Sequence, residues 1–375
     1  MTQQFSPLSL VQHRIVLGQP LPFNVRDHDR TLLLAKGQLL RTPAQLQALM
    51  QRGALVDLAE LQSQADALRM AKPQELPRMW KRCLDQLGES LLRAGEAGFR
   101  ETVEEAAGPV RALIERDPDL AIFQVLRPAD NPLLKYGTDH AVHAAICTQL
   151  VARRLGWEEA DVQRAFKTAL TMNVGMLELQ GLLATQTTPP TPEQRRAIHA
   201  HPIESRRLLE LGGVSDADWL RAVEDHHETA DGQGYPKGLR EVGDIAALVH
   251  RADVYTAKLS PRAGREAMAA DQAGRQMFMQ DQGHPMTAAL VKEFGVYPPG
   301  CWVRLANGEC GIVVRRGPTV MTPVVAVMTT AGGQTLSRPV RRDTSQAGQA
   351  VQGLMQGAAR PLTISTAELM GVAET

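Results

Sequence analysis

The sequence predicts a mainly α-helical protein, with a small mixed β/α domain at the N-terminus and a short β hairpin near the C-terminus. From residue 76 onward, apolar residues recur at spacings of three and four, which is the period of an amphipathic helix. Before residue 60 the apolar residues alternate as in a strand. Near the C-terminus two apolar runs flank Asn307-Gly308, a dipeptide typical of a hairpin turn.

Residues 1–60 are expected to form the small N-terminal domain. Leu21, Phe23 and Val25 alternate with polar or proline positions, and a second apolar run follows at 32–34 after a polar turn. A short helix is expected to begin at Pro43. Residues 61–75 are polar and are interpreted as a linker to the next domain.

Residues 76–296 are expected to form one helical domain. A further helix start is indicated at Asp117-Pro118, a cap followed by a proline in the first turn. Capping-box patterns begin at Thr191 and at Ser215, so helices are expected to start at both. The later helices are predicted at 138–155, 158–172, 192–210, 216–228, 243–259 and 285–294.

The C-terminal part divides into two predicted segments. Residues 297–343 hold the expected hairpin and form a small β appendage. Residues 344–375 carry small and polar residues with little periodicity, a composition typical of a partly disordered tail.

Composition excludes several classes of protein. Lys and Arg total 41, equal to Asp and Glu, which argues against a DNA or RNA partner held by bulk positive charge. Aromatic residues make up 4%, too few for an extended base-stacking surface. No signal peptide and no apolar run of transmembrane length is evident. We therefore expect a cytoplasmic protein that does not contact a membrane.

Eight of the ten histidines lie between residues 140 and 284. Together with one aspartate in an otherwise apolar helix, they suggest a metal site, because imidazole and carboxylate are common ligands of divalent metals. Inward-facing side chains of these types on several helices can build such a site. The residues placed on separate predicted helices are His140, His201, the pair His226-His227, and Asp253. The interpretation kept for His143, His199, His250 and His284 is a structural one, a hydrogen-bonded core or boundary residue.

The run from His226 to Pro236 (HHETADGQGYP), followed by Gly238-Leu239, resembles the signature of HD-GYP domains. These domains belong to the HD metal-dependent phosphohydrolases, and the resemblance extends over residues 128–315. It implies hydrolysis of cyclic di-GMP at a centre of two or three metal ions, often iron or manganese. It also implies metal ligands at His140, His201, His226, His227 and Asp253. Nucleotide contacts are implied at Asp231, Gly232, Gly234, Tyr235, Pro236, Arg262 and Arg265.

The name-giving His-Asp dipeptide, which the family follows with x-Gly-Lys, is absent from the matching stretch. Met172 and Asn173 stand in its place, Gly175 is kept, and Met176 replaces the lysine. The aspartate is implied to bridge two metals, whereas an asparagine offers only a neutral carbonyl oxygen. A thioether is poorly matched to Mn or Fe(II). We therefore expect at most one well-held divalent ion, iron or manganese, with a metal-free pocket as the alternative, and we assign no catalytic residue.

Three functions follow as hypotheses. The first is a degenerate HD-GYP protein of bacterial cyclic di-GMP signalling that hydrolyses little or nothing. It would bind cyclic di-GMP or a related nucleotide, or a signalling protein through residues 229–239, here called the GYP loop. The second is a weakly active metal-dependent cyclic di-GMP phosphodiesterase that uses the surviving ligands. The third is a structural or interaction module. Whether the chain is an enzyme, and its oligomeric state, stay open at this point.

Overall fold

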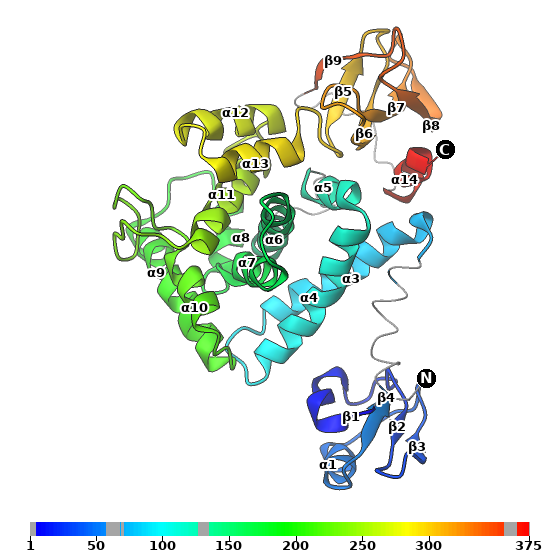
Figure 1. Ribbon diagram of the computed structural model, residues 1–375, viewed down its shortest axis with the longest axis vertical. Coiled ribbons are helices and arrows are strands. Elements are labelled where there is room, and N and C mark those ends of the chain that lie inside the picture. Colours follow the sequence, from blue (N-terminus) through cyan, green and yellow to red (C-terminus); the bar gives the residue numbers. More distant parts are fainter. Residues whose placement is uncertain (1–4, 58–67, 69–70, 127–134, 356–365, 375) are drawn as a thin grey trace.

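A computed structural model describes residues 5–57, 68, 71–126, 135–355 and 366–374. Within these residues the chain forms 13 α-helices and two small antiparallel sheets, which confirms the mainly α fold class. The helical part occupies the centre, with one sheet near each end of the chain (Figure 1). None of the described helices has both the length and the apolar character that crossing a bilayer requires.

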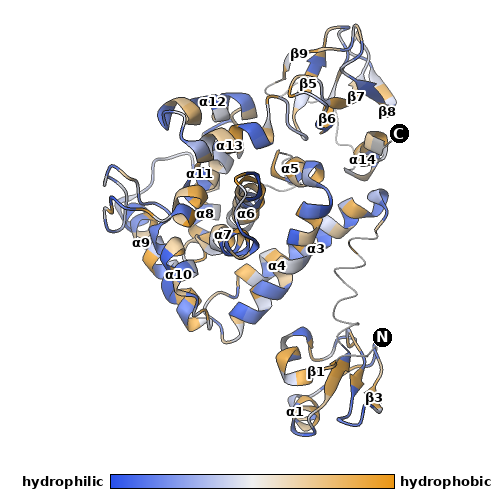
Figure 2. Ribbon diagram, in the orientation of Figure 1, coloured by the Kyte–Doolittle hydropathy of each residue, from blue (hydrophilic) through white to orange (hydrophobic). Residues whose placement is uncertain are grey.

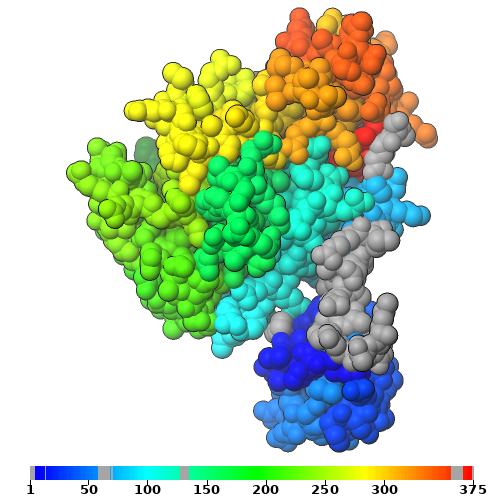
Figure 3. Space-filling model, in the orientation of Figure 1, coloured from blue at the N-terminus to red at the C-terminus, as the bar shows by residue number. Residues whose placement is uncertain are grey.

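The N-terminal domain is a separate lobe below the helical part (Figure 3). Its sheet has the order β1-β4-β2-β3, and Leu21, Phe23 and Val56 are buried against it. The expected pairing of residues 25–26 with 32–34 is present, and Thr42 begins the helix with a capping box. The elements are β1 (Phe5–Pro7), β2 (Val25–Arg26), β3 (Leu32–Leu34), α1 (Pro43–Gln51) and β4 (Leu55–Asp57).

The helical domain is built around α6, which Figure 1 shows nearly end-on in the middle of the bundle. Fifteen of its residues are buried, including the small side chains of Ala141, Ala144 and Ala145, which let neighbouring helices approach closely. A helix that is buried on nearly every face is a core helix. The helices are α3 (Leu76–Leu91), α4 (Phe99–Arg116), α5 (Pro118–Leu126), α6 (Tyr136–Arg154), α7 (Glu159–Thr171), α8 (Leu177–Thr185), α9 (Pro192–Leu211), α10 (Ala217–Asp225), α11 (Asp244–Leu259), α12 (Ala270–Gln280) and α13 (Pro285–Phe294).

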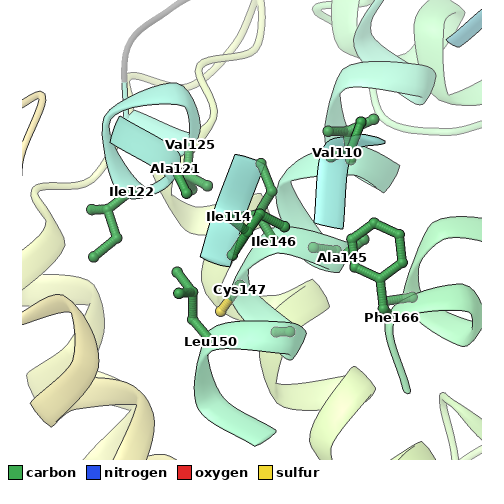
Figure 4. Packing of buried hydrophobic residues seen from close by; sticks show 14 of the residues in the cluster. Val110, Ile114, Ala121, Ile122, Val125, Ala145, Ile146, Cys147, Leu150 and Phe166 are labelled. Carbon is green, nitrogen blue, oxygen red and sulfur yellow. The ribbon is translucent and has the colours of Figure 1, made fainter. Parts of the chain in front are cut away.

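Apolar side chains from four successive helices meet at the centre of this domain. Figure 4 shows Ile114 of α4, Ala121 of α5, Ile146 of α6 and Phe166 of α7 gathered in one cluster. Each of these side chains is at most 1% exposed. Figure 2 shows that several surrounding helices carry hydrophilic residues on part of their surface and apolar residues on the rest. The histidine-bearing helices therefore stand on a packed, rigid core.

Two predicted helix starts can be compared with the structure. Thr191 begins α9 as expected: its hydroxyl accepts from the Gln194 N–H at 3.2 Å, and the Gln194 side chain accepts from the Thr191 N–H at 2.8 Å. Helix α10 begins one residue later than expected, because Asp216 rather than Ser215 is the cap. The Asp216 carboxylate accepts from two backbone N–H groups and also pairs with Arg164. The Asp216 carboxylate therefore caps the helix in place of the Ser215 hydroxyl.

The C-terminal region is a larger sheet than the expected hairpin. Asn307-Gly308 does connect β5 and β6, and Gly308 has a φ of 87°. Three more strands extend the sheet to the order β8-β7-β6-β5-β9, and a helix follows within the segment interpreted as a tail. The sequence predicts a partly disordered tail here, because the strand β9 and the helix in this segment are short and weakly periodic. The elements are β5 (Trp302–Leu305), β6 (Cys310–Arg315), β7 (Val324–Thr329), β8 (Thr335–Asp343), β9 (Val351–Leu354) and α14 (Thr366–Glu374).

Candidate metal centre

Three histidines converge where α9 meets the end of α10. His201 projects from α9, and His226 and His227 follow the last residue of α10. One ligand atom from each residue lies within 4.8 Å of the other two. The Nε2 atoms of His201 and His226 are 3.2 Å apart, and both side chains are at most 1% exposed. The three rings are thus gathered tightly enough to share one ion.

The hydrogen bonds of two of these rings define their tautomers. His201 Nδ1 donates to the Ile198 carbonyl at 2.5 Å, and His226 Nδ1 donates to the Val223 carbonyl at 2.6 Å. A carbonyl oxygen only accepts, so both protons sit on Nδ1, and in the neutral rings both Nε2 atoms carry lone pairs. Two lone pairs that face each other at 3.2 Å repel unless a cation lies between them.

A proton does not fill that place near neutral pH. Burial lowers the pKa of His201 to about 3 and that of His226 to about 4. Burial also holds the pKa of His227 well below its ordinary value. The three imidazoles are therefore neutral, and neutral imidazole whose other nitrogen donates to a carbonyl is the usual form of a metal-ligating histidine. The chemistry of this donor set fits a divalent metal ion.

The other two predicted ligands form a pair of their own. His140 of α6 and Asp253 of α11 lie with Nε2 and Oδ1 2.6 Å apart. Burial alone would raise the pKa of Asp253, but the hydrogen bond from His140 and the nearby imidazoles hold it well below its usual range. The charge of Asp253 also acts on all three clustered histidines, so the pair lies beside them. His140 Nδ1 is buried without a hydrogen-bond partner among the described residues.

The stretch that matches the family dipeptide lies at the turn between α7 and α8. Met172 is fully buried and belongs to the apolar core. Asn173 is 1% exposed, and its side-chain oxygen has no hydrogen-bond partner in the described part of the chain. Met176 is half-buried and precedes α8. Neither Met172 nor Met176 offers a charge.

Gly175 explains why this turn lies so close to the histidine helix. Its N–H donates to the Ser205 hydroxyl of α9 at 3.0 Å. A Cβ added at Gly175 would lie 2.9 Å from the Ser205 backbone nitrogen, so only glycine allows the contact. The turn that holds Asn173 is therefore pressed against the helix that carries His201.

The GYP loop folds back onto His227. A Cβ at Gly234 would lie 2.5 Å from the His227 carbonyl oxygen, so the loop backbone rests directly on the histidine pair. Tyr235 donates its N–H to the same carbonyl at 3.1 Å, and its ring stacks on the His227 ring with centroids 4.5 Å apart. Gly232 has a φ of 75°, and Pro236 follows a cis peptide bond.

Asp231, by contrast, is engaged within its own turn. Its carboxylate accepts from the Thr229 hydroxyl at 2.6 Å and from the Gln233 N–H at 3.0 Å. These bonds hold the pKa of Asp231 below its ordinary value. The structure therefore gives Asp231 a role in shaping the loop, and its predicted nucleotide contact stays a prediction.

Glu228 is a residue whose role the sequence did not reveal. Its carboxylate is 2% exposed and accepts from three backbone N–H groups of the GYP loop, those of Lys237 (2.6 Å), Gly238 (3.2 Å) and Leu239 (2.8 Å). Lys237 in turn contacts Asp225 at 3.0 Å. An acidic residue between a histidine pair and a glycine-rich loop was the only available signal.

The two predicted nucleotide-binding arginines lie at the His140 side of the centre. Arg262 donates from Nε to the Tyr136 hydroxyl at 2.9 Å, and the Tyr136 ring stacks on the His140 ring. Arg262 and Arg265 close a tight turn through two backbone hydrogen bonds of 2.9 Å. The Arg265 guanidinium donates to the Ala257 and Ser260 carbonyls. Tyr136 therefore links Arg262 to the His140–Asp253 pair, a role that no local sequence pattern indicates.

A cavity of about 770 Å³ lies beside the GYP loop, between α11, α12 and α13. Its lining includes Glu228, which follows His227 in the chain, and His250, whose Nδ1 donates to the His226 carbonyl at 3.0 Å. None of the three clustered histidines lines it. Volume alone would favour this cavity, but the convergent ligand atoms lie elsewhere, so we assign the chemistry to the histidine group.

Comparisons with known proteins find a matching domain family and several relatives. Residues 129–283 match the family model of the HD domain. The chain is 28% identical over 267 residues to the cyclic di-GMP phosphodiesterase PA4108 of Pseudomonas aeruginosa, which covers 68% of this chain and 63% of that protein. It is 29% identical over 171 residues to the 3'3'-cGAMP-specific phosphodiesterase 3 of Vibrio cholerae, covering 44% of this chain and 36% of the relative. This chain thus spans less than two thirds of the length of either relative.

A solved structure shows the same fold. Bd1817, described as a HDG"Y"P protein from Bdellovibrio bacteriovorus, superposes with a TM-score of 0.50 at 18% identity, covering 78% of this chain and 99% of that one. The part of the helical bundle that carries the histidine group therefore lies in a region similar to the HD domain. More narrowly, the signature from His226 to Pro236 resembles that of HD-GYP domains, and the chain is similar in sequence to the two phosphodiesterases named above. HD-type phosphohydrolases are generally metal-dependent.

Proposed function

We propose that this chain binds a cyclic dinucleotide, cyclic di-GMP or a close relative, in a bacterial signalling role, and that it hydrolyses the nucleotide slowly or not at all. The supporting observation is a histidine group that suits one metal ion beside a turn without the acidic residue that a second ion requires. The similarity to enzymes named for cyclic di-GMP and cGAMP supports the class of nucleotide.

One divalent ion, iron or manganese, has suitable ligands in this chain. His201, His226 and His227 offer neutral nitrogens, and the Ile198 and Val223 carbonyls fix the orientation of the first two rings. The negative charge of Asp253 lies beside the group, where it offsets part of the charge of an ion. When bound, such an ion supplies a water of lowered pKa and positive charge for phosphate oxygens.

A second ion lacks the charge that would hold it. Two dications about 4 Å apart repel by roughly 16 kcal/mol at an effective dielectric near 20, because four unit-charge products contribute about 4 kcal/mol each. A bridging carboxylate offsets much of this repulsion. The neutral Asn173 amide does not, and Met172 is packed in the apolar core. The reduced hydrolysis that we propose follows from this missing charge.

The chain's own residues still suit nucleotide binding. Arg262 lies within hydrogen-bond reach of Tyr136 at the His140 side, where a guanidinium is placed to contact a phosphate. Tyr235 covers His227 on another side of the group. The GYP loop that positions Tyr235 is held by the carboxylate of Glu228, which does not depend on the residues at 172–176.

A weak phosphodiesterase is the second candidate. The observation that favours it is the survival of the His140–Asp253 pair beside three converging histidines, since a single ion with a bound water can support hydrolysis. A purely structural or interaction module, including protein binding through the GYP loop, is the third candidate.

One experiment separates these functions. The purified chain is analysed for bound metal, titrated with cyclic di-GMP, and then incubated with it while linear and mononucleotide products are measured. We expect at most one metal ion per chain and nucleotide binding with little or no product. Product that disappears in a His226→Ala variant would establish the phosphodiesterase. Absence of both binding and product would leave the interaction module.

A further inference from the structure

Four aromatic rings form a continuous row from the metal centre to the protein surface. The His226 and His227 ring centroids lie 4.1 Å apart, His227 and Tyr235 lie 4.5 Å apart, and Tyr235 and His199 lie 4.6 Å apart. The first ring is fully buried, the middle two are half-buried and the last is exposed. The row therefore leads outward from the candidate ion to an exposed imidazole.

His199 contributes little else that the structure records. Its ring makes no hydrogen bond or ion pair within the described residues, and its ring contact there is the one with Tyr235. It lies two residues before His201 on α9, so the helix that supplies a ligand also positions this outer ring. The structural role that the sequence suggests for His199, a hydrogen-bonded core or boundary residue, does not fit, because the exposed ring makes no hydrogen bond within the described residues.

The surroundings of His199 favour an anionic ligand with a flat ring. Arg195 lies one helical turn earlier, and residues four apart share a helix face. The Arg195 guanidinium donates to the Pro190 carbonyl and pairs with no carboxylate among the described residues. The Tyr235 ring contacts the His199 ring at an interplanar angle of 41°. An exposed ring held in this way, with a cationic group on the same helix face, suits a nucleobase and its phosphate.

We infer that His199, supported by Tyr235, is the platform on which a purine base of the cyclic dinucleotide stacks while a phosphate lies at the metal centre. This inference rests on the proposed function and assigns its base-contacting residue. Two ring-to-ring steps, of 4.5 and 4.6 Å, separate His227 from His199, so base and phosphate of one nucleotide would both be in reach. Both nucleotides named for the relatives, cyclic di-GMP and cGAMP, carry purine bases.

The test compares affinities of substituted chains for cyclic di-GMP by calorimetric titration. His199→Ala is expected to weaken binding about 5- to 150-fold, the range for losing one base–aromatic stack. His199→Phe is expected to recover most of the affinity, because the ring is restored, whereas His199→Gln is not. All three variants are expected to keep the wild-type metal content, since His199 is outside the ligand group. His28→Ala, an exposed histidine of the N-terminal lobe, is the matched control and should bind as the wild type does.

Two smaller probes distinguish stacking from a structural effect. GMP carries a base, whereas ribose 5-phosphate does not. The His199→Ala substitution should therefore weaken the binding of GMP and leave the binding of ribose 5-phosphate unchanged. The inference would be overturned if His199→Ala weakened the binding of both probes equally, or if it bound cyclic di-GMP as tightly as the wild type does. The proposed function would stand in either case. A wild-type chain that fails to bind cyclic di-GMP overturns the proposed function, and the inference with it.

Discussion

The carboxylate of Glu228 should control how firmly the GYP loop is held over the histidine pair. In Glu228→Gln one carboxylate oxygen becomes an NH₂ group. The remaining oxygen can still accept from the Lys237 and Gly238 N–H groups. The Leu239 N–H then faces the new NH₂ group, which is also a donor, and loses its acceptor. One charge-assisted hydrogen bond is then lost and two become neutral bonds, each about half as strong.

The magnitude follows from these three bonds. A hydrogen bond to a charged group contributes about 1.5–3 kcal/mol and a neutral one about 0.5–1.5 kcal/mol. The N–H groups of residues 237 and 238 belong to exposed residues and regain water on opening, which reduces the loss. We expect the free energy of opening the loop to fall by about 2–4 kcal/mol. The amide protons of the loop should then exchange roughly 30- to 800-fold faster.

Hydrogen exchange measured by mass spectrometry on a peptide covering residues 237–239 checks this expectation. Glu241→Gln is the matched control, because Glu241 is exposed in the same region, and its effect should stay within about 0.5 kcal/mol. Metal content, measured in parallel, shows whether the histidine pair is kept. If exchange at these residues is the same in Glu228→Gln and the wild type, the assigned role of Glu228 is wrong.

Three further outcomes are expected. Met172→His combined with Asn173→Asp should raise the metal content above the wild-type value in elemental analysis, because it restores a nitrogen ligand and a negative charge; a folded variant with unchanged content contradicts the ligand assignment. Mn²⁺ at a hundredfold excess over its Kd should stabilise the chelator-stripped wild type by about 2.7 kcal/mol and raise Tm by about 5–10 °C, and His226→Ala should show no rise. Gly234→Ala should lower the free energy of unfolding by about 1–3 kcal/mol, since its Cβ would lie 2.5 Å from backbone atoms. In the control Gly88→Ala the added Cβ would lie 3.7 Å from its nearest neighbour, so chemical denaturation should show an unchanged or higher free energy of unfolding.

Much of the helical domain could be predicted because its signals are local. The capping box at Thr191 lies within four residues, and the signature from His226 to Pro236 lies within eleven. Close backbone contacts explain why the glycines in that signature are needed, as at Gly234. Where the determining contacts are short in sequence, the pattern of residue types is enough to locate the element.

The features that were not predicted depend on contacts between distant residues. His140 and Asp253 are 113 residues apart, and nothing in either helix indicates that the two side chains bond to each other rather than only to an ion. Tyr136 meets Arg262 across 126 residues. Glu228 binds backbone N–H groups, which every residue type except proline offers, so its partners leave no trace in the sequence. The tautomers of the histidines likewise depend on carbonyl positions that only the fold supplies.

Helix α14 has a consequence for how the protein is made. Its Leu369 is fully buried, and the helix contacts α3, the first helix of the bundle, as well as β6, β7 and β8. Of the described elements, α14 leaves the ribosome last, yet it covers part of α3, the first helix of the bundle to emerge. The part of the α3 surface that α14 covers therefore stays exposed until synthesis has passed residue 366. During that interval the nascent chain exposes this apolar surface, and changes in α14 should lower the yield of folded protein without altering the histidine group.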